Sequence, residues 1–79
     1  MSNLNRLKNV FTTILEIEED QVNEDLKYDG NSVWDSINHM FLITELENEF
    51  SVEIDPDDIL EIKSFNQAQN VLGKYDIEF

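Results

Sequence analysis

The segment from Ser36 to Phe50, SINHMFLITELENEF, constrains the fold more than any other part of the sequence. Its apolar residues recur at intervals of three and four, which predicts an amphipathic helix with Asp35 or Ser36 as its N-cap and an end at Ser51. When the residues are placed at 100° steps, one face is predicted to enter the core, and it carries His39, Leu42, Ile43, Leu46 and Phe50.

A second stripe runs along the opposite side of this predicted helix. It consists of Ile37, Met40, Phe41 and Thr44, with Asn48 in the same sector. An amphipathic helix in a monomer needs only one apolar face. These residues are therefore either partly covered by the preceding loop or kept for a partner, and the pattern leaves both interpretations open.

Three more helices are predicted. The first spans roughly residues 3–15 and is capped by Ser2. A short helix follows the extended residues 51–54, with Asp55 as its N-cap, proline at its first position and acids in its first turn. Ser64 and Gln67 have capping-box spacing before the last helix, which ends near Gly73. The predicted fold class is all-α: a small four-helix bundle whose third helix is short.

A long loop, residues 16–35, is predicted between the first two longer helices. Its sequence, EIEEDQVNEDLKYDGNSVWD, mixes acids with Asn, Ser and Asp-Gly. Loops of this length in a small domain usually have a function. The apolar residues expected to anchor it to the core are Ile17, Val22, Leu26, Tyr28, Val33 and Trp34.

The composition limits the possible functions. The chain of 79 residues has no cysteine and a net charge of −13, and residues 36–61 contain eight acids and no Lys or Arg. We expect one domain over residues 1–79, in the cytoplasm and monomeric, without disulfides or a thiolate zinc site. Such a charge disfavours nucleic acid and anionic membranes and favours partners with basic patches, although acidity also serves solubility alone. No apolar run reaches the roughly 18 residues of a membrane span.

Ser36 is the residue whose chemistry needs an explanation. His39 lies one helical turn away, but its predicted place on the core face and the lack of an orienting third group disfavour a Ser/His dyad. Neither acidic stretch has the ligand spacing of an EF-hand, so no specific metal site is expected. With neither a dyad nor a metal site expected, the protein is not expected to be an enzyme. A helix N-terminus tolerates an esterified phosphate, so Ser36 is suited as a point of attachment.

The tripeptide Asp35-Ser36-Ile37, followed by an apolar helix and ELENEF, resembles the acyl carrier protein signature. VEIDPDDI and SFNQAQNVL continue the family's order, so the resemblance covers nearly the whole chain. It implies that Ser36 receives 4′-phosphopantetheine from coenzyme A through a separate phosphopantetheinyl transferase. The arm then carries acyl or aminoacyl groups as thioesters to partner enzymes, and an acyl chain can slip between the helices. Asp35 is implied to help the transferase recognise the site, although a plain helix cap explains it equally well.

The sequence departs from this family at three positions. Val33 replaces a glycine two residues before the aspartate, and Asn38 and Phe41 replace acids. The Trp-Asp-Ser-Ile form is similar to free-standing carriers of specialised pathways, including D-alanyl, polysaccharide, polyketide and nonribosomal peptide carriers. The resemblance therefore favours a specialised pathway over bulk fatty acid synthesis. The predicted partner surface consists of Ile37, Met40, Phe41, Thr44, Glu45, Glu47 and Asn48.

Two alternatives remain open. An acidic interaction module that binds a basic partner without a prosthetic group would explain the charge, but not the Asp-Ser-Ile junction. A carrier of general fatty acid synthesis would explain both, and general fatty acid enzymes would then accept the loaded protein. Replacing Ser36 by alanine distinguishes the module from a carrier of either kind.

Overall fold

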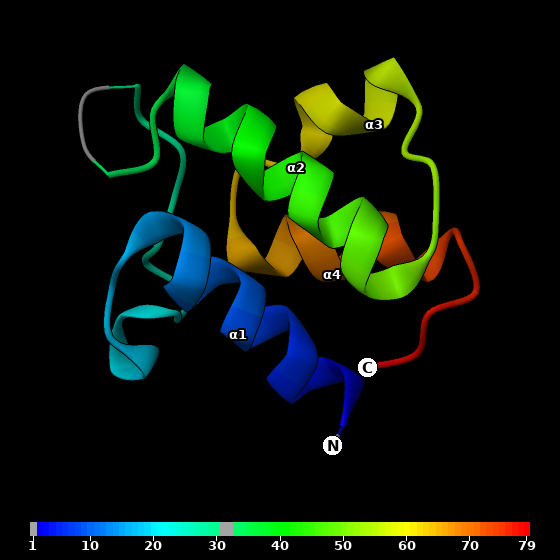
Figure 1. Ribbon diagram of the computed structural model, residues 1–79, viewed down its shortest axis with the longest axis horizontal. Coiled ribbons are helices and arrows are strands. Elements are labelled where there is room, and N and C mark those ends of the chain that lie inside the picture. The colour runs from blue at the N-terminus through cyan, green and yellow to red at the C-terminus, as the bar shows by residue number, and fades with distance from the viewer. Residues whose placement is uncertain (1, 31–32) are drawn as a thin grey trace.

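The chain folds into four α-helices within the part that the computed structural model describes, residues 2–30 and 33–79. These helices are α1 (Asn3–Leu15), α2 (Ser36–Phe50), α3 (Pro56–Glu61) and α4 (Phe65–Gly73). The predicted all-α fold, with its short third helix and its long connection between α1 and α2, is confirmed (Figure 1). Of the predicted loop, Asn31 and Ser32 lie outside the described residues.

The helix ends follow local signals in the sequence. The Ser2 and Ser64 hydroxyls accept hydrogen bonds from the N–H groups three residues ahead, and Asp35 does the same for α2. The C-cap residues that follow α1 and α2 are Glu16 and Ser51, whose φ angles of 55° and 56° are left-handed. The predicted end of the second helix at Ser51 is therefore confirmed, without the glycine that usually occupies such a position.

Two predicted caps differ in detail. Asp55 precedes α3 as expected, but its carboxylate caps no N–H; its backbone N–H instead donates to the Tyr75 hydroxyl at 3.0 Å. The side chain of Gln67 accepts from the Lys63 N–H at 3.2 Å rather than from the Ser64 N–H, so the predicted capping box is only half formed. The bond of Asp55 is a tertiary contact, which sequence spacing does not reveal, whereas the bond between Lys63 and Gln67 is local and lies one residue away from the predicted one.

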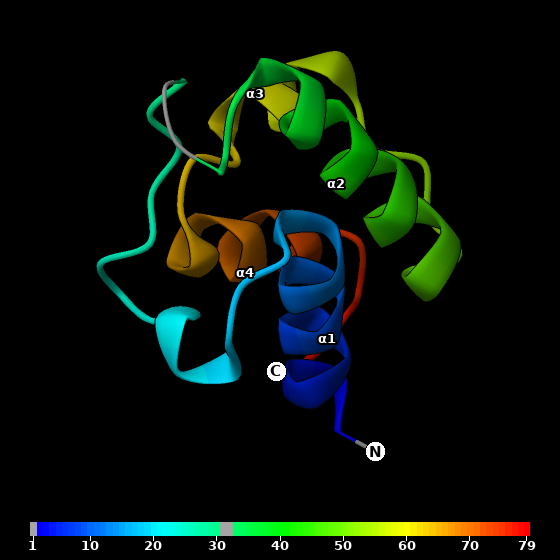
Figure 2. The same cartoon turned by 60° about the vertical axis from the view of Figure 1, so that its left-hand side comes forward.

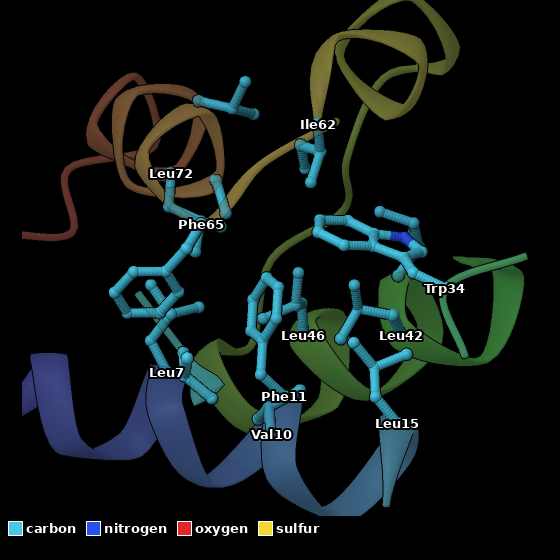
Figure 3. Close-up of a cluster of buried hydrophobic side chains, with 14 of the residues drawn as sticks. Leu7, Val10, Phe11, Leu15, Trp34, Leu42, Leu46, Ile62, Phe65 and Leu72 are labelled. Carbon is cyan, nitrogen blue, oxygen red and sulfur yellow. The ribbon is translucent and has the colours of Figure 1, made fainter. Parts of the chain in front are cut away.

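The helices enclose one apolar core, drawn in Figure 3. α2 packs beside α1; in Figure 1 α4 lies behind α2, and in Figures 1 and 2 α3 lies above α4. Phe11 of α1 lies at the centre and makes edge-to-face contacts with Trp34 (5.3 Å between centroids) and Phe65 (5.2 Å). Each such contact adds about 0.5–1.5 kcal/mol to the burial of the rings. The core therefore fixes the loop against α1 through Trp34, and fixes α1 against α4 through Phe65.

The long connection is more ordered than predicted and one of its expected anchors is wrong. It contains a short 3₁₀-helix, η1 (Glu19–Gln21). The expected anchors Val22 and Trp34 are buried, and Ile17, Leu26 and Tyr28 are partly buried. Val33, in contrast, is 44% exposed. Its neighbour Trp34 is fully buried, so this bend brings only one of the two side chains into the core.

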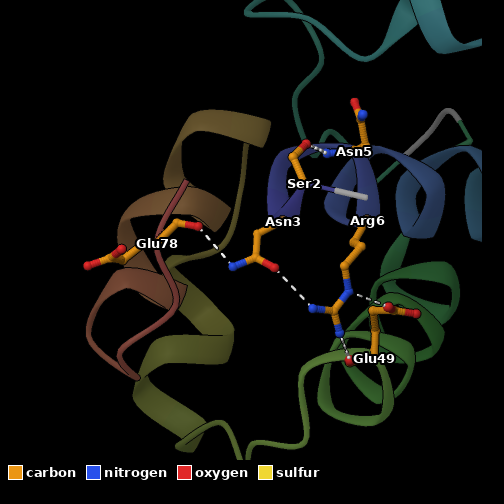
Figure 4. A network of polar contacts seen from close by, with 6 residues as sticks. All are labelled: Ser2, Asn3, Asn5, Arg6, Glu49 and Glu78. Atoms are coloured by element: carbon orange, nitrogen blue, oxygen red, sulfur yellow. Dashed lines mark hydrogen bonds and ion pairs between the residues drawn. The ribbon is translucent and has the colours of Figure 1, made fainter.

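The start of α1 is tied to the end of α2 and to the C-terminal segment (Figure 4). Arg6 Nε lies 2.7 Å from the Glu49 carboxylate, and the same guanidinium donates to the Glu49 carbonyl and lies over the Phe50 ring at 4.8 Å. Asn3 accepts from Arg6 and donates to the Glu78 carbonyl, both at 3.0 Å. Phe50 is accordingly only partly buried at this edge of the core. In the described part of the chain no helix is both long and apolar enough to cross a membrane.

Candidate functional site

Ser36 is the first residue of α2 and its side chain is exposed. Asp35 adopts an extended conformation, and its Oδ1 accepts from the Asn38 N–H at 2.8 Å, which caps the helix and sets the corner at which the serine stands. The N–H groups of Ser36 and Ile37 belong to the first turn and have no intrahelical acceptor. The serine oxygen therefore lies at the positive end of a fifteen-residue helix.

The turn before Ser36 is braced by Asn38. Its side-chain amide donates to the Val33 carbonyl at 2.7 Å. A carboxylate in place of Asn38 has no hydrogen to donate to a carbonyl. The two departures from the family pattern are therefore structurally linked.

His39 does not have the environment that its helix face predicts. Its ring is half-buried at the edge of the core and both nitrogens are engaged (Nδ1 with Trp34 Nε1 at 2.9 Å, and Nε2 with the Ile59 carbonyl at 2.9 Å). An indole N–H is only a donor, so Nδ1 accepts and Nε2 carries the hydrogen. Neither nitrogen is free to take a proton from Ser36. This arrangement disfavours a Ser/His dyad for a reason that the sequence did not show.

A cleft of about 410 Å³ opens beside Ser36. One wall comes from α2 and the other from α3 and the segment that follows it, and most of the lining side chains are apolar. Lys63 lies at its edge, where Tyr28 N–H donates to the Lys63 carbonyl at 2.8 Å and holds the loop against this segment. The lining residues are Tyr28, Ser36, His39, Met40, Ile59, Leu60, Ile62 and Lys63.

The second stripe of α2 is open to solvent. Ile37, Met40 and Phe41 are 67%, 54% and 58% exposed, so the long loop does not cover them. Thr44 and Asn48, further along the same side, are also exposed. Leu60 of α3 is 70% exposed and adds to the exposed apolar surface. Sequence reasoning missed Leu60, although Ile59 and Ile62 on either side of it have the spacing of the inward face of α3.

The two acids of the predicted partner surface have different environments. Glu47 is half-buried, and its Oε2 accepts from the Ile54 N–H at 2.8 Å, which stabilises the connection between α2 and α3. Glu45 is half-buried as well, further from that connection. A structural role for Glu47 thus competes with a role in binding.

A cluster around Asp58 holds α3 to the end of α4. The Tyr75 hydroxyl donates to Asp58 at 2.6 Å, and Lys74 Nζ lies 3.2 Å from the same carboxylate and 3.3 Å from Glu61. The hydrogen bond from Tyr75, and then Lys74, lower the pKa of Asp58. The same bonds to Asp58 raise the pKa of Tyr75 and of Lys74. The cluster is therefore most favourable when Asp58 is ionised and both partners are protonated.

Comparison with known protein families identifies residues 5–68 as a phosphopantetheine attachment site, the PP-binding family. The match spans most of the chain, and the protein belongs to this family. Members carry 4′-phosphopantetheine covalently on a serine, and they interact with phosphopantetheinyl transferases and acyl-handling enzymes. The chain is thus a phosphopantetheine carrier protein of the acyl carrier type.

The residues around Ser36 fit such a group. The exposed hydroxyl lies at a positive helix end, which suits a phosphodiester. The cleft beside it has mostly apolar walls for an arm or its cargo, and Lys63 is among its lining residues. The terminal thiol of the arm would supply the nucleophile that holds an acyl group as a thioester.

Proposed function

We propose that Ser36 is the attachment serine, and that the protein carries acyl or aminoacyl groups as thioesters on its 4′-phosphopantetheine arm. One observation carries the assignment: Ser36 is exposed at the N-terminus of α2 and lines the apolar cleft. Asp35 sets its position by capping the helix, and the transferase would read this corner. The protein acts as one carrier domain over residues 1–79, in the cytoplasm and as a monomer, and is not itself an enzyme.

The test is the intact mass of the purified protein before and after incubation with coenzyme A, Mg²⁺ and a broad-specificity phosphopantetheinyl transferase. We expect the parent to gain one phosphopantetheinyl group and the Ser36→Ala variant to gain none. Ser51→Gly is the matched control, because it removes a serine at the other end of the same helix and should leave loading unchanged. No gain with several transferases would instead support an acidic module that binds a basic partner.

We propose further that the exposed side of α2 is the surface that partner enzymes contact. Its support is the exposure of its apolar members together with the acidic residues around them. Such a surface suits an enzyme with a basic rim around an apolar centre. The surface consists of Ile37, Met40, Phe41, Thr44, Glu45, Glu47 and Asn48.

The pathway served is, in our proposal, a specialised one rather than bulk fatty acid synthesis. Phe41 supports this proposal, because an exposed aromatic ring stands where carriers of fatty acid synthesis usually present an acid. Enzymes of general fatty acid synthesis should therefore accept the loaded protein poorly. Their turnover of the loaded carrier, compared with a general fatty acid carrier at equal concentration, tests the proposal, and equal turnover would contradict it.

A further inference from the structure

Two hydrogen bonds of one imidazole connect parts of the site that are distant in the sequence. Trp34 precedes Ser36 by two residues, and its indole N–H donates to His39 Nδ1. On the other side of the ring, His39 Nε2–H donates to the carbonyl of Ile59, a residue of α3 that lines the cleft. The turn that presents the serine is thereby joined to the far wall of the cleft through a single side chain.

Neighbouring aromatic rings hold the His39 imidazole in place, so a displacement of the hydrogen-bond partner at one nitrogen also moves the other nitrogen. Trp34 stacks on it at 6.0 Å between centroids with an interplanar angle of 29°, and Tyr28 packs against it edge-on at 5.4 Å. The Trp34 ring is in turn fully buried against Phe11. His39 is therefore a rigid link between two segments, in contrast to a flexible surface side chain.

The α3 helix is the segment that such a link would control. It has six residues, none of them buried. Within the described residues, the bond from His39 to Ile59 is the one hydrogen bond between α2 and α3. Segments with few buried contacts are the ones that move at low cost. The Asp58 cluster ties α3 to the end of α4, and His39 supplies its hydrogen bond to α2.

We propose that His39 is a positioning residue that couples α3 to the turn before Ser36. Cargo bound in the cleft would then change the environment of Trp34 and the conformation of this turn. The cargo part of this proposal rests on the proposed function. Cargo that contacts Ile59 and Leu60 shifts α3, the shift acts on the Nε2 hydrogen bond, and the ring transmits it to the indole. Coupling of this kind is reciprocal, so changes at Trp34 must also alter α3.

The first experiment uses the unmodified protein and does not depend on loading. Trp34→Phe removes the indole N–H but keeps an aromatic ring, and it lies outside α3. We expect hydrogen exchange at the Ile62 amide, which donates to the Asp58 carbonyl across α3, to accelerate about fivefold beyond the change in global stability. Val10→Ala, a core change in α1, is the control, and its effect on this amide should follow global stability alone.

Two substitutions of His39 separate its bonds. His39→Asn keeps an acceptor near the Nδ1 position for Trp34, and His39→Gln keeps a donor near the Nε2 position for Ile59. We expect His39→Asn to preserve the NMR resonance of the indole N–H of Trp34, the chain's single tryptophan, while α3 exchanges faster. We expect His39→Gln to preserve slow exchange in α3 while the indole resonance moves.

The second experiment measures the response to cargo. Carriers bearing an arm with a non-hydrolysable acyl chain are compared with carriers bearing the arm alone, and we expect the Trp34 indole resonance to shift in the parent but not in His39→Asn, which lacks the link to α3. Either of two results would overturn the proposal. In the first, hydrogen exchange at Ile62 in Trp34→Phe changes only as much as global stability predicts, as in Val10→Ala. In the second, the indole resonance of the parent does not shift when cargo is attached. If no arm can be attached at all, the proposed function fails instead, and the exchange experiment alone decides the coupling.

Discussion

Replacing Arg6 by alanine should destabilise the fold more than any other single change on the surface of α1. The guanidinium is about one-third exposed (33% side-chain exposure), as is its partner Glu49 (35%), so we assign the ion pair only about 0.5–1 kcal/mol. The bond to the Glu49 carbonyl satisfies one of the last acceptors of α2 and adds about 1 kcal/mol. The contact with Phe50 adds about 0.5–1 kcal/mol. The total loss is about 2–3 kcal/mol.

The assay is equilibrium unfolding by urea and by heat, at low and at high salt. A loss of 2–3 kcal/mol corresponds to a fall in melting temperature of at least about 8 °C for a domain of this size. Salt should remove only the ion-pair part, because the carbonyl bond and the ring contact are not screened in the same way. The difference between the parent and Arg6→Ala should therefore shrink by less than half at high salt.

Two control variants make the reasoning refutable. Lys8→Ala changes the net charge equally and lies on the same helix, so it corrects for the larger self-repulsion of an acidic chain. Arg6→Lys keeps the charge but loses the forked geometry, and should fall between the parent and Arg6→Ala. If Arg6→Ala lies within about 0.5 kcal/mol of Lys8→Ala, the network in Figure 4 contributes little and the argument is wrong.

Three further predictions follow from the caps, the Asp58 cluster and the exposed stripe. Ser51→Gly should raise the free energy of unfolding by about 0.5–1 kcal/mol, because Ser51 is left-handed (φ 56°); no gain in urea unfolding would contradict this. Tyr75→Phe should lower the melting temperature between about pH 5 and 9. Because the pKa of Asp58 is lowered, its stabilising contribution is present above the ordinary carboxyl pKa of about 4 and is lost as the pH falls through the lowered value. The raised pKa values of Tyr75 and Lys74 keep their contribution below about pH 10 and lose it above, so a pH-independent effect would be contrary to expectation. Phe41→Glu should leave unfolding unchanged, since Phe41 is 58% exposed, but should slow cargo loading by the cognate enzyme; an equal loading rate would exclude Phe41 from the partner surface.

The helices were predictable because their signals are local. Ser2, Asp35 and Ser64 cap the N–H groups three residues ahead, and such a spacing is visible in the sequence. The helical period places buried residues on one side of α2, and the structure buries Leu42, Ile43 and Leu46 there. These features depend on contacts within one turn or one face, so no knowledge of the tertiary structure was needed.

The loop and the site were less predictable because they depend on contacts between distant residues. Nothing local tells Val33 from Trp34 as an anchor; the choice is made by the space beside Phe11. The sequence likewise places His39 on the inward side of α2, but not at the edge between Trp34 and Ile59 where its nitrogens find partners. Periodicity gives a direction, whereas hydrogen-bond partners depend on how the helices pack.

The departures from the family pattern are best understood together. A glycine at position 33 would give the turn before Ser36 more conformational freedom. Here α2 itself supplies hydrogen-bond partners for this turn: Asn38 binds the Val33 carbonyl and His39 binds the Trp34 indole, one after the other in the first turn of the helix. Both residues also stand next to the exposed stripe, so the same turn of helix orders the approach to Ser36 and borders the proposed partner surface. A partner that binds this surface would therefore contact the same helical turn whose Asn38 and His39 side chains hold the segment before Ser36 in place.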